Sequence, residues 1–134
     1  MDFTDILKPG LSAEKTEIVS EKNTASYYGS GFLDVFSTPC MIALMEGSAL
    51  SAVDPFLPQG WSTVGTELNV KHLSATPLGM KVSAKAELLS IDGRALQFKV
   101  EAFDEAGKIG EGTHNRFIVE SAKLIARAEA KKNK

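Results

Sequence analysis

Three side chains that can exchange protons or bind oxygen atoms, Thr38, Glu46 and His72, lie in otherwise apolar parts of the sequence. Glu46 falls within an apolar helix pattern, where helical spacing puts it on a face with Ile42 and Ala49. A carboxylate there is costly to desolvate unless it is paired, hydrogen-bonded or open to a cleft. Two explanations stay open: a functional carboxylate, or one bonded to a neighbouring amide at the rim of the helix interface.

His72 is the second residue that could do chemistry. Strict alternation puts it on the same strand face as Val64, Leu68 and Val70, and this face should meet the helix. A lone histidine on an apolar face is more often a satisfied core residue. With Glu46 in the same layer, however, two titratable groups can set each other's protonation. The pair therefore indicates a site for general acid–base chemistry.

Thr38 is the third candidate and stands at the start of the helix. Ser37 and Thr38 are two possible N-caps, and Pro39 suits the first helical position. Capping alone would explain Thr38. The helix N-terminus is also the positive end of the helix dipole, where free backbone N–H groups can stabilise an oxyanion.

Other reactive side chains receive simpler interpretations. Cys40 lies in the first helical turn and could act as a nucleophile with His72, but small cysteines in helices are commonly buried core residues. His114 and Arg116 share a strand face with two glycines. That face could contact an anionic ligand, but we assign it to solvent.

The elements that must position these residues follow from hydrophobic periodicity. The sequence predicts one helix over 37–53, and Asp92-Gly93 between two alternating runs is a hairpin signal. Alternating patterns predict five strands, at 14–20, 62–75, 80–91, 94–104 and 108–120. One long helix against a curved antiparallel sheet is an α+β arrangement.

The remaining segments complete a single domain over 1–134, with a core of about 10–120. Residues 1–12 are expected to be a loose lead-in, 21–36 a loop pinned by aromatic side chains, and 121–134 a short helix with a polar tail. A single helix leaves such a sheet incompletely covered, and edge strands need protection. We therefore expect a homodimer.

Composition limits the classes of function. The chain has 134 residues and a net charge of −2, which gives no electrostatic case for nucleic acid. One cysteine and two histidines make a metal site unexpected. The first ten residues lack the pattern of a signal peptide, and no apolar run approaches the length of a membrane span. We expect a cytoplasmic protein that does not bind membranes.

The sequence resembles the thioesterase subgroup related to fluoroacetyl-CoA thioesterase, whose members have a hot-dog fold. The resemblance covers about residues 10–120. It is carried by three stretches: VFSTPCMIALMEGSA, STVGTELNVKHLSATPLGMKVSAKAEL and EGTHNRFIV. They contain a Thr-Pro helix start, a helix glutamate two turns later, a strand with a glycine and a histidine, and a closing G-x-H-x-R strand.

The resemblance implies a role for each of five residues. Thr38 matches the active-site threonine, Glu46 the helix carboxylate and His72 the strand histidine. Gly65 matches a glycine beside the acyl group, where the missing side chain leaves room for the thioester. Phe32 falls where the fluoroacetate-specific relative has an aromatic gate. The resemblance also implies an acyl-CoA site between two subunits.

These roles imply thioester hydrolysis to free acid and CoA, with no cofactor because CoA is part of the substrate. His72 could act as general base or protonate the leaving thiolate. Glu46 could orient His72, activate water or attack the carbonyl, and Thr38 could hydrogen-bond the carboxylate or the carbonyl oxygen. Two alternatives stay open: a hydratase or dehydratase acting on an acyl thioester, and a non-catalytic acyl-CoA binding module.

Overall fold

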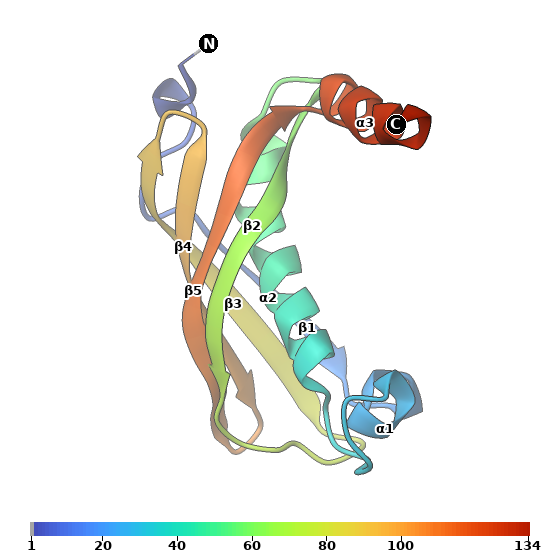
Figure 1. Ribbon diagram of the computed structural model, residues 1–134. Coiled ribbons are helices and arrows are strands. Elements are labelled where there is room, and N and C mark those ends of the chain that lie inside the picture. The colour runs from blue at the N-terminus through green and yellow to red at the C-terminus, as the bar shows by residue number, and fades with distance from the viewer. Residues whose placement is uncertain (1) are drawn as a thin grey trace.

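The computed structural model describes residues 2–134 and contains a five-stranded antiparallel sheet with one long helix against it (Figure 1). The strands lie in the order β1-β3-β4-β5-β2, so β1 and β2 form the two edges. Their bounds are β1 (Ser12–Ile18), β2 (Trp61–His72), β3 (Lys81–Asp92), β4 (Ala95–Asp104) and β5 (Gly107–Glu120). The hydrophobic alternation therefore predicted all five strands, with their ends displaced by no more than three residues.

The long helix, α2 (Thr38–Val53), begins as the sequence predicts but is capped by one specific residue. The Ser37 hydroxyl accepts a hydrogen bond from the Cys40 backbone N–H at 3.2 Å, so Ser37 is the N-cap. Thr38 is already helical, and the interpretation of Thr38 as a cap is wrong. The helix ends at Val53, before Asp54 and Pro55.

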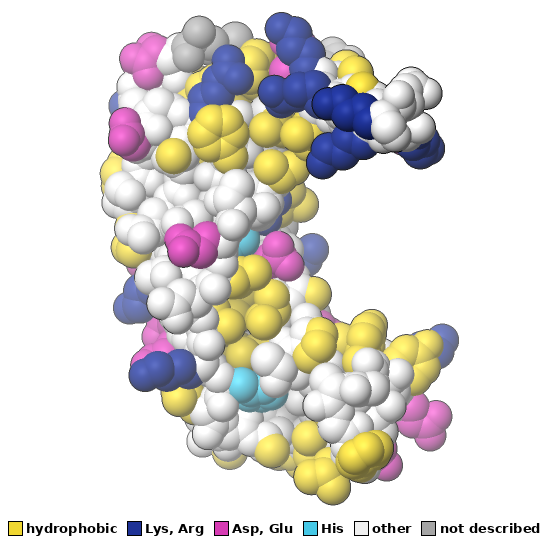
Figure 2. Space-filling view, viewed as in Figure 1, with side chains coloured by type: hydrophobic (Ala, Val, Ile, Leu, Met, Phe, Trp, Pro, Cys, Tyr) yellow, Lys and Arg dark blue, Asp and Glu magenta, His cyan; other side chains and the backbone are white. Residues whose placement is uncertain are grey.

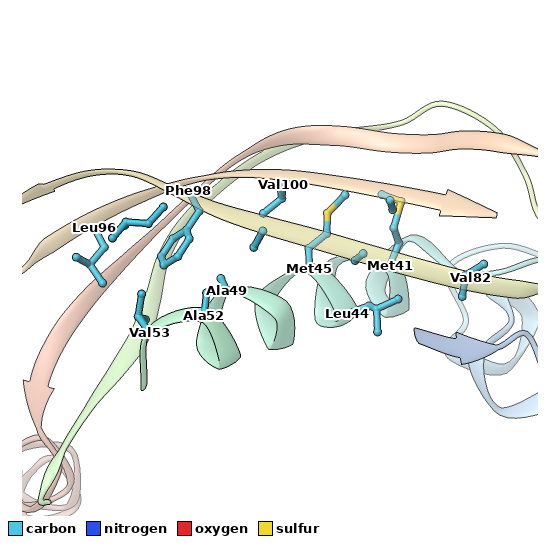
Figure 3. Packing of buried hydrophobic residues seen from close by; sticks show 14 of the residues in the cluster. Met41, Leu44, Met45, Ala49, Ala52, Val53, Val82, Leu96, Phe98 and Val100 are labelled. Carbon is cyan, nitrogen blue, oxygen red and sulfur yellow. The ribbon is translucent and has the colours of Figure 1, made fainter. Parts of the chain in front are cut away.

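The core lies between α2 and the concave face of the sheet. Met41, Met45 and Ala49 are buried along the helix and face Phe98 and Val100 on β4 (Figure 3). Burying a side chain of this size typically contributes about 1.5–3 kcal/mol, so this stripe holds the helix in place. Cys40 is also buried, as a free thiol. Glu46 is half-buried, and therefore lies at the margin of the stripe rather than inside it.

The two ends of the chain behave differently from each other. Phe3 and Leu7 are buried in the core, so the expectation of a loose lead-in over 1–12 is wrong. The core therefore begins before residue 10, at Phe3. At the other end, α3 (Ser121–Glu129) continues directly from β5 and projects as an arm at the top of Figure 1. No helix within residues 2–134 is long and apolar enough to span a membrane.

The segment before α2 is only partly anchored by its aromatic side chains. It contains a short helix, α1 (Ala25–Tyr28), which forms the lower arm in Figure 1. Phe36 is buried, whereas Tyr27, Tyr28 and Phe32 are exposed. Of these four aromatic residues, Phe36 is thus the one that anchors the segment to the core. Between the two arms the molecule is hollowed, as Figure 2 shows.

An irregularity in β2 decides which of its side chains face the helix. Gly65 pairs with Arg116 and Glu67 pairs with Asn115, so Thr66 is an extra residue that forms a β-bulge. The bulge reverses the inward and outward positions along the strand. Leu68, Val70 and His72 face α2 as predicted. Upstream of the bulge, Thr63 and Gly65 face inward, and the inward assignment of Val64 is wrong.

Candidate active site

Thr38 and His72 meet at the N-terminal end of α2. The Thr38 Oγ1 atom lies 2.7 Å from Nδ1 of His72, which is the last residue of β2. A hollow of about 310 Å³ opens beside them, and its wall includes Phe36 and the backbone after β2. A hydroxyl and an imidazole are thus held together next to the positive end of a helix, an arrangement suited to proton transfer at a carbonyl group.

The environment of His72 favours its neutral form. Burial lowers the pKa of His72 below its ordinary value, and the nearby backbone of Ser74 opposes this only in part. The Nδ1 atom is engaged with Thr38. The Nε2 atom is buried and has no hydrogen-bond partner within residues 2–134. This second nitrogen is therefore the one whose hydrogen-bonding capacity is unused within the described residues.

Glu46 lies away from this pair, against the middle of β2. It is eight residues after Thr38, which corresponds to about 12 Å along the helix axis. A Cβ atom on Gly65 would lie 2.8 Å from Oε2 of Glu46 and 3.1 Å from Cε1 of His114. The missing side chain of Gly65 therefore lets the carboxylate approach the strand backbone closely.

Beside Glu46, the structure places two basic side chains that the sequence interpretation assigned to solvent. His114 is 0% exposed and Arg116 is 6% exposed, so that interpretation is wrong. Arg116 Nη1 lies 3.2 Å from His114 Nε2. Because a guanidinium can only donate, His114 Nε2 must accept, and Nδ1 carries the proton that it donates to the Glu67 carbonyl at 2.9 Å. Burial lowers the pKa of His114, consistent with this neutral form.

Arg116 is anchored from its other side by a short hydrogen-bond chain. Its Nε donates to Thr63 Oγ1 and its Nη2 to the Thr63 carbonyl, both at 2.8 Å. The Thr63 hydroxyl in turn donates to Asp54 Oδ1 at 2.6 Å. Burial lowers the pKa of Arg116, while the carboxylates of Asp54 and Glu46 oppose this shift. The cation is thus fixed by Thr63 and His114, and it lies within the electrostatic influence of two carboxylates, Asp54 at the end of α2 and Glu46 in its middle.

Within one chain, the five residues singled out from the sequence fall into three places. Thr38 and His72 are hydrogen-bonded, and Glu46 and Gly65 are in close contact about two helical turns away. Phe32 is 100% exposed and does not line the hollow beside Thr38. Within residues 2–134, no three His, Cys, Asp or Glu side chains are grouped in a way that could hold a metal ion.

The sequence contained a signal for the buried His114 and Arg116. On the opposite face of β5, Glu111, Thr113 and Asn115 are polar and partly or fully exposed. A strand with one such face turns its other face to the core. The face with His114 and Arg116 was therefore the inward one, despite its two basic residues.

The long helix against a curved antiparallel sheet is the hot-dog fold. A hot-dog-like protein from Thermanaerovibrio acidaminovorans superposes with a TM-score of 0.89 at 25% identity, covering 98% of this chain and 97% of that chain. Residues 19–122 match the family of fluoroacetyl-CoA-specific thioesterases, and the chain belongs to this family.

Two comparisons within the family agree with this assignment. Fluoroacetyl-CoA thioesterase from Streptantibioticus cattleyicolor is 40% identical over 100 residues, which are 75% of this chain and 72% of that protein. A solved structure of the fluoroacetyl-CoA thioesterase FlK has a TM-score of 0.87 at 34% identity, covering 93% of this chain and 97% of that chain. Variants of FlK have been solved with acetyl-CoA, and with fluoroacetate and CoA.

Proposed function

We propose that the chain hydrolyses acyl-CoA thioesters to a free acid and CoA. The observation that carries the proposal is the 2.7 Å contact between Thr38 and His72 at the helix N-terminus, in a chain of the thioesterase family. Thioester hydrolysis needs an activated water molecule and donors for the developing oxyanion. The start of α2 offers the positive end of the helix dipole, and the two polar side chains offer proton transfer.

Glu46 and His72 divide the chemistry between them in this proposal. The oxygen of a water molecule bonds to the thioester carbon as the water gives a proton to Glu46. The carbon–sulfur bond then breaks to give the free acid, and the thiolate of CoA takes the proton that Glu46 received, relayed by His72, so that Glu46 is again a carboxylate. Thr38 orients the imidazole through their hydrogen bond. Gly65 leaves room for the acyl group beside Glu46, and Phe32 closes over it from the exposed segment before α2.

The proposal includes a homodimer, with each site built between two copies. Glu46 is about 12 Å along the helix axis from Thr38 in one chain, so a second copy is the means of completing the site. The edge strand β2 is 12 residues long and, within residues 2–134, forms its ladder with β5 alone, and such an edge favours pairing with another strand. Light scattering tests this, and a monomer mass at every concentration would contradict it.

The proposed reaction uses water and the side chains of the protein, with CoA present only as part of the substrate. No partner other than the acyl-CoA and the second copy is proposed. A cytoplasmic location remains a prediction from the sequence.

The test is release of free CoA thiol from a panel of short, medium and aromatic acyl-CoA substrates. We expect turnover above the uncatalysed rate for at least one class of acyl group. Folded dimer without turnover on any substrate would contradict the proposal. An enoyl-CoA in the panel, followed by its absorbance, separates hydration from hydrolysis, and tight binding without turnover would indicate a binding module.

A further inference from the structure

A second hollow lies at the opposite end of the sheet from Thr38, where α3 leaves β5. It has a volume of about 430 Å³ and is bounded by α3 and the end of β5, together with Arg94 from the turn between β3 and β4. We call it the α3 groove. Its floor includes Phe117 and Val119, and Phe117 is 41% exposed. An apolar floor with an accessible aromatic ring is suited to a flat ring system.

The rim of the α3 groove is positively charged. Arg94, Lys123 and Arg127 line it, whereas Glu120 is the one carboxylate among its lining residues within 2–134. Glu120 lies 3.6 Å from Lys123, in an exposed pair that contributes little. The Arg94 guanidinium lies 4.8 Å from the centre of the Trp61 ring, which fixes its position at the mouth of the groove.

The charge around the groove contrasts with the rest of the chain. Residues 121–134 contain five of the 15 lysines and arginines but one of the 17 acidic residues, a net charge of +4. Residues 1–120 therefore carry −6, since the whole chain carries −2. Figure 2 shows dark-blue side chains gathered on the upper arm, on the same side as the hollowed face. Such an asymmetry attracts a polyanion to this end of the molecule.

We propose that the α3 groove binds the nucleotide end of the acyl-CoA, with the adenine against Phe117 and the phosphates near Arg94, Lys123 and Arg127. This rests on the proposed function. Phe117 directly follows Arg116 in β5, so the two side chains lie on opposite faces of the strand, and the three residues from Arg116 to Val119 correspond to about 10 Å of strand. The groove is therefore close to the region of Glu46 along the strand but on the other face of the sheet, and one extended ligand would reach both around the end of the sheet where α3 leaves β5. The family match ends at residue 122, so Lys123 and Arg127 lie outside that match, whereas Arg94 and Phe117 lie inside it.

A concave binding site explains these features better than a membrane surface does. Ile125 is an exposed apolar residue on α3, but the helix has nine residues and the cations surround a hollow. Peripheral helices that bind membranes use a continuous apolar face with cations along both sides.

The test compares one acyl group on CoA and on pantetheine, which lacks the nucleotide. In Lys123→Gln/Arg127→Gln, we expect KM for the acyl-CoA to rise about 10-fold or more, because two charge-assisted contacts are lost. The kcat for acyl-CoA and both constants for acyl-pantetheine should stay unchanged. Lys131→Gln/Lys132→Gln makes the same charge change outside the lining of the groove and should leave KM within about twofold.

Two results would overturn the inference: an equal rise in KM for both thioesters, or no rise for either. Binding of adenosine 3′,5′-bisphosphate, measured by calorimetry, gives a readout that does not depend on hydrolysis. We expect it to bind the unaltered protein and to bind the double variant at least about 10-fold more weakly. If no thioester is hydrolysed but the bisphosphate binds, the proposed reaction is contradicted and nucleotide binding in the α3 groove is supported. Binding to anionic vesicles with no binding of the bisphosphate would assign the charge to a membrane surface instead.

Discussion

The start and the middle of α2 present two polar regions that are built in different ways. At the start, Thr38 and His72 are joined by one hydrogen bond and border an open hollow. In the middle, Glu46 faces a buried cation, Arg116, that is held by hydrogen bonds from three of its nitrogens. A pair with one contact can adjust to a substrate, whereas a fully bonded buried network holds one geometry.

The difference indicates a division of labour. The region around Glu46 supplies a carboxylate next to a fixed, buried cation, and charges held in place in this way can stabilise a transition state electrostatically. The region around Thr38 supplies a hydroxyl and an imidazole whose Nε2 has no partner within residues 2–134. Variants at the two regions should therefore differ in how strongly they affect rate and stability.

The largest effect is expected at Glu46. Glu46→Gln keeps the shape of the side chain but removes the base, and general base catalysis typically contributes about 10²–10⁴-fold. We expect kcat for thiol release to fall by at least about 100-fold, with an unchanged thermal midpoint. Glu14→Gln makes the same charge change on the exposed side of β1 and should be silent. A rate within threefold of the unaltered enzyme would remove Glu46 from the site.

Gly65→Ala tests the close approach between α2 and β2. The added Cβ would lie 2.8 Å from Glu46 Oε2, so the carboxylate must move. We expect kcat to fall by about 10- to 100-fold, since small displacements of a catalytic group can cost that much. Gly47→Ala is the matched control, because its Cβ would meet only the flexible Lys15 side chain and alanine favours a helix. Equal activity of both variants would show that Glu46 is not held by this contact.

The start of α2 offers two adjacent hydroxyls with separate roles. Thr38→Ala removes the contact to His72, and we expect about a 10-fold loss of kcat with little change in stability. Ser37→Ala removes the helix cap, and we expect about 1 kcal/mol less stability with retained kcat. The measurements are thiol release and denaturant unfolding of both variants. The reverse pattern would mean that Thr38 is structural.

The regular helix and strands could be predicted from the sequence. So could the orientation of side chains that lie on an uninterrupted part of a strand. Periodicity located α2 and all five strands. In β2, the five residues from Leu68 to His72 alternate between the two faces without interruption. The inward orientation of His72 followed from this. The orientation of Gly65 could not be derived in the same way, because alternation from His72 puts it on the outer face. The resemblance to the family was needed to place it near the acyl group.

The missed residues depend on pairing between strands that are distant in sequence. The bulge at Thr66 exists because two residues of β2 lie opposite one position of β5, which no local pattern encodes. His114 and Arg116 were assigned to solvent because basic side chains on a strand are usually exposed, and the contacts that make burial of Arg116 favourable, those with Thr63 among them, come from another strand. The contact between Arg116 and Thr63 joins residues that are 53 positions apart in the sequence.

Thr63→Val tests the anchoring of Arg116 from the side opposite to Glu46. It leaves the Arg116 Nε atom and the Asp54 carboxylate each without one partner, which should reduce stability by about 1–3 kcal/mol. A smaller, severalfold loss of kcat should accompany it. Thr63→Ser keeps the hydroxyl and should restore both properties. Unchanged unfolding of Thr63→Val would show that Arg116 is held without this chain.

The smallest effect is a dependence of stability on pH. Burial lowers the pKa of both His72 and His114 in the folded protein, below the unfolded value of about 6.5. Below that pH the unfolded chain therefore binds more protons than the folded one, and the free energy of unfolding falls as the pH decreases. Denaturant unfolding at pH 7.5 and 5.5 measures this. His114→Gln should reduce the difference, and equal stability at both pH values would contradict it.

The extra residue at Thr66 has a further consequence for anyone who alters or compares this strand. It separates two regular segments of β2, one with Gly65 and one with His72, whose inward–outward alternation is shifted by one residue. Removing Thr66 would make the alternation continuous along β2. Either Gly65 or His72 would then face outward, depending on which segment kept its pairing with β5. An alignment that closes this one-residue gap would match the wrong faces, so the length of β2 must be conserved together with its residues.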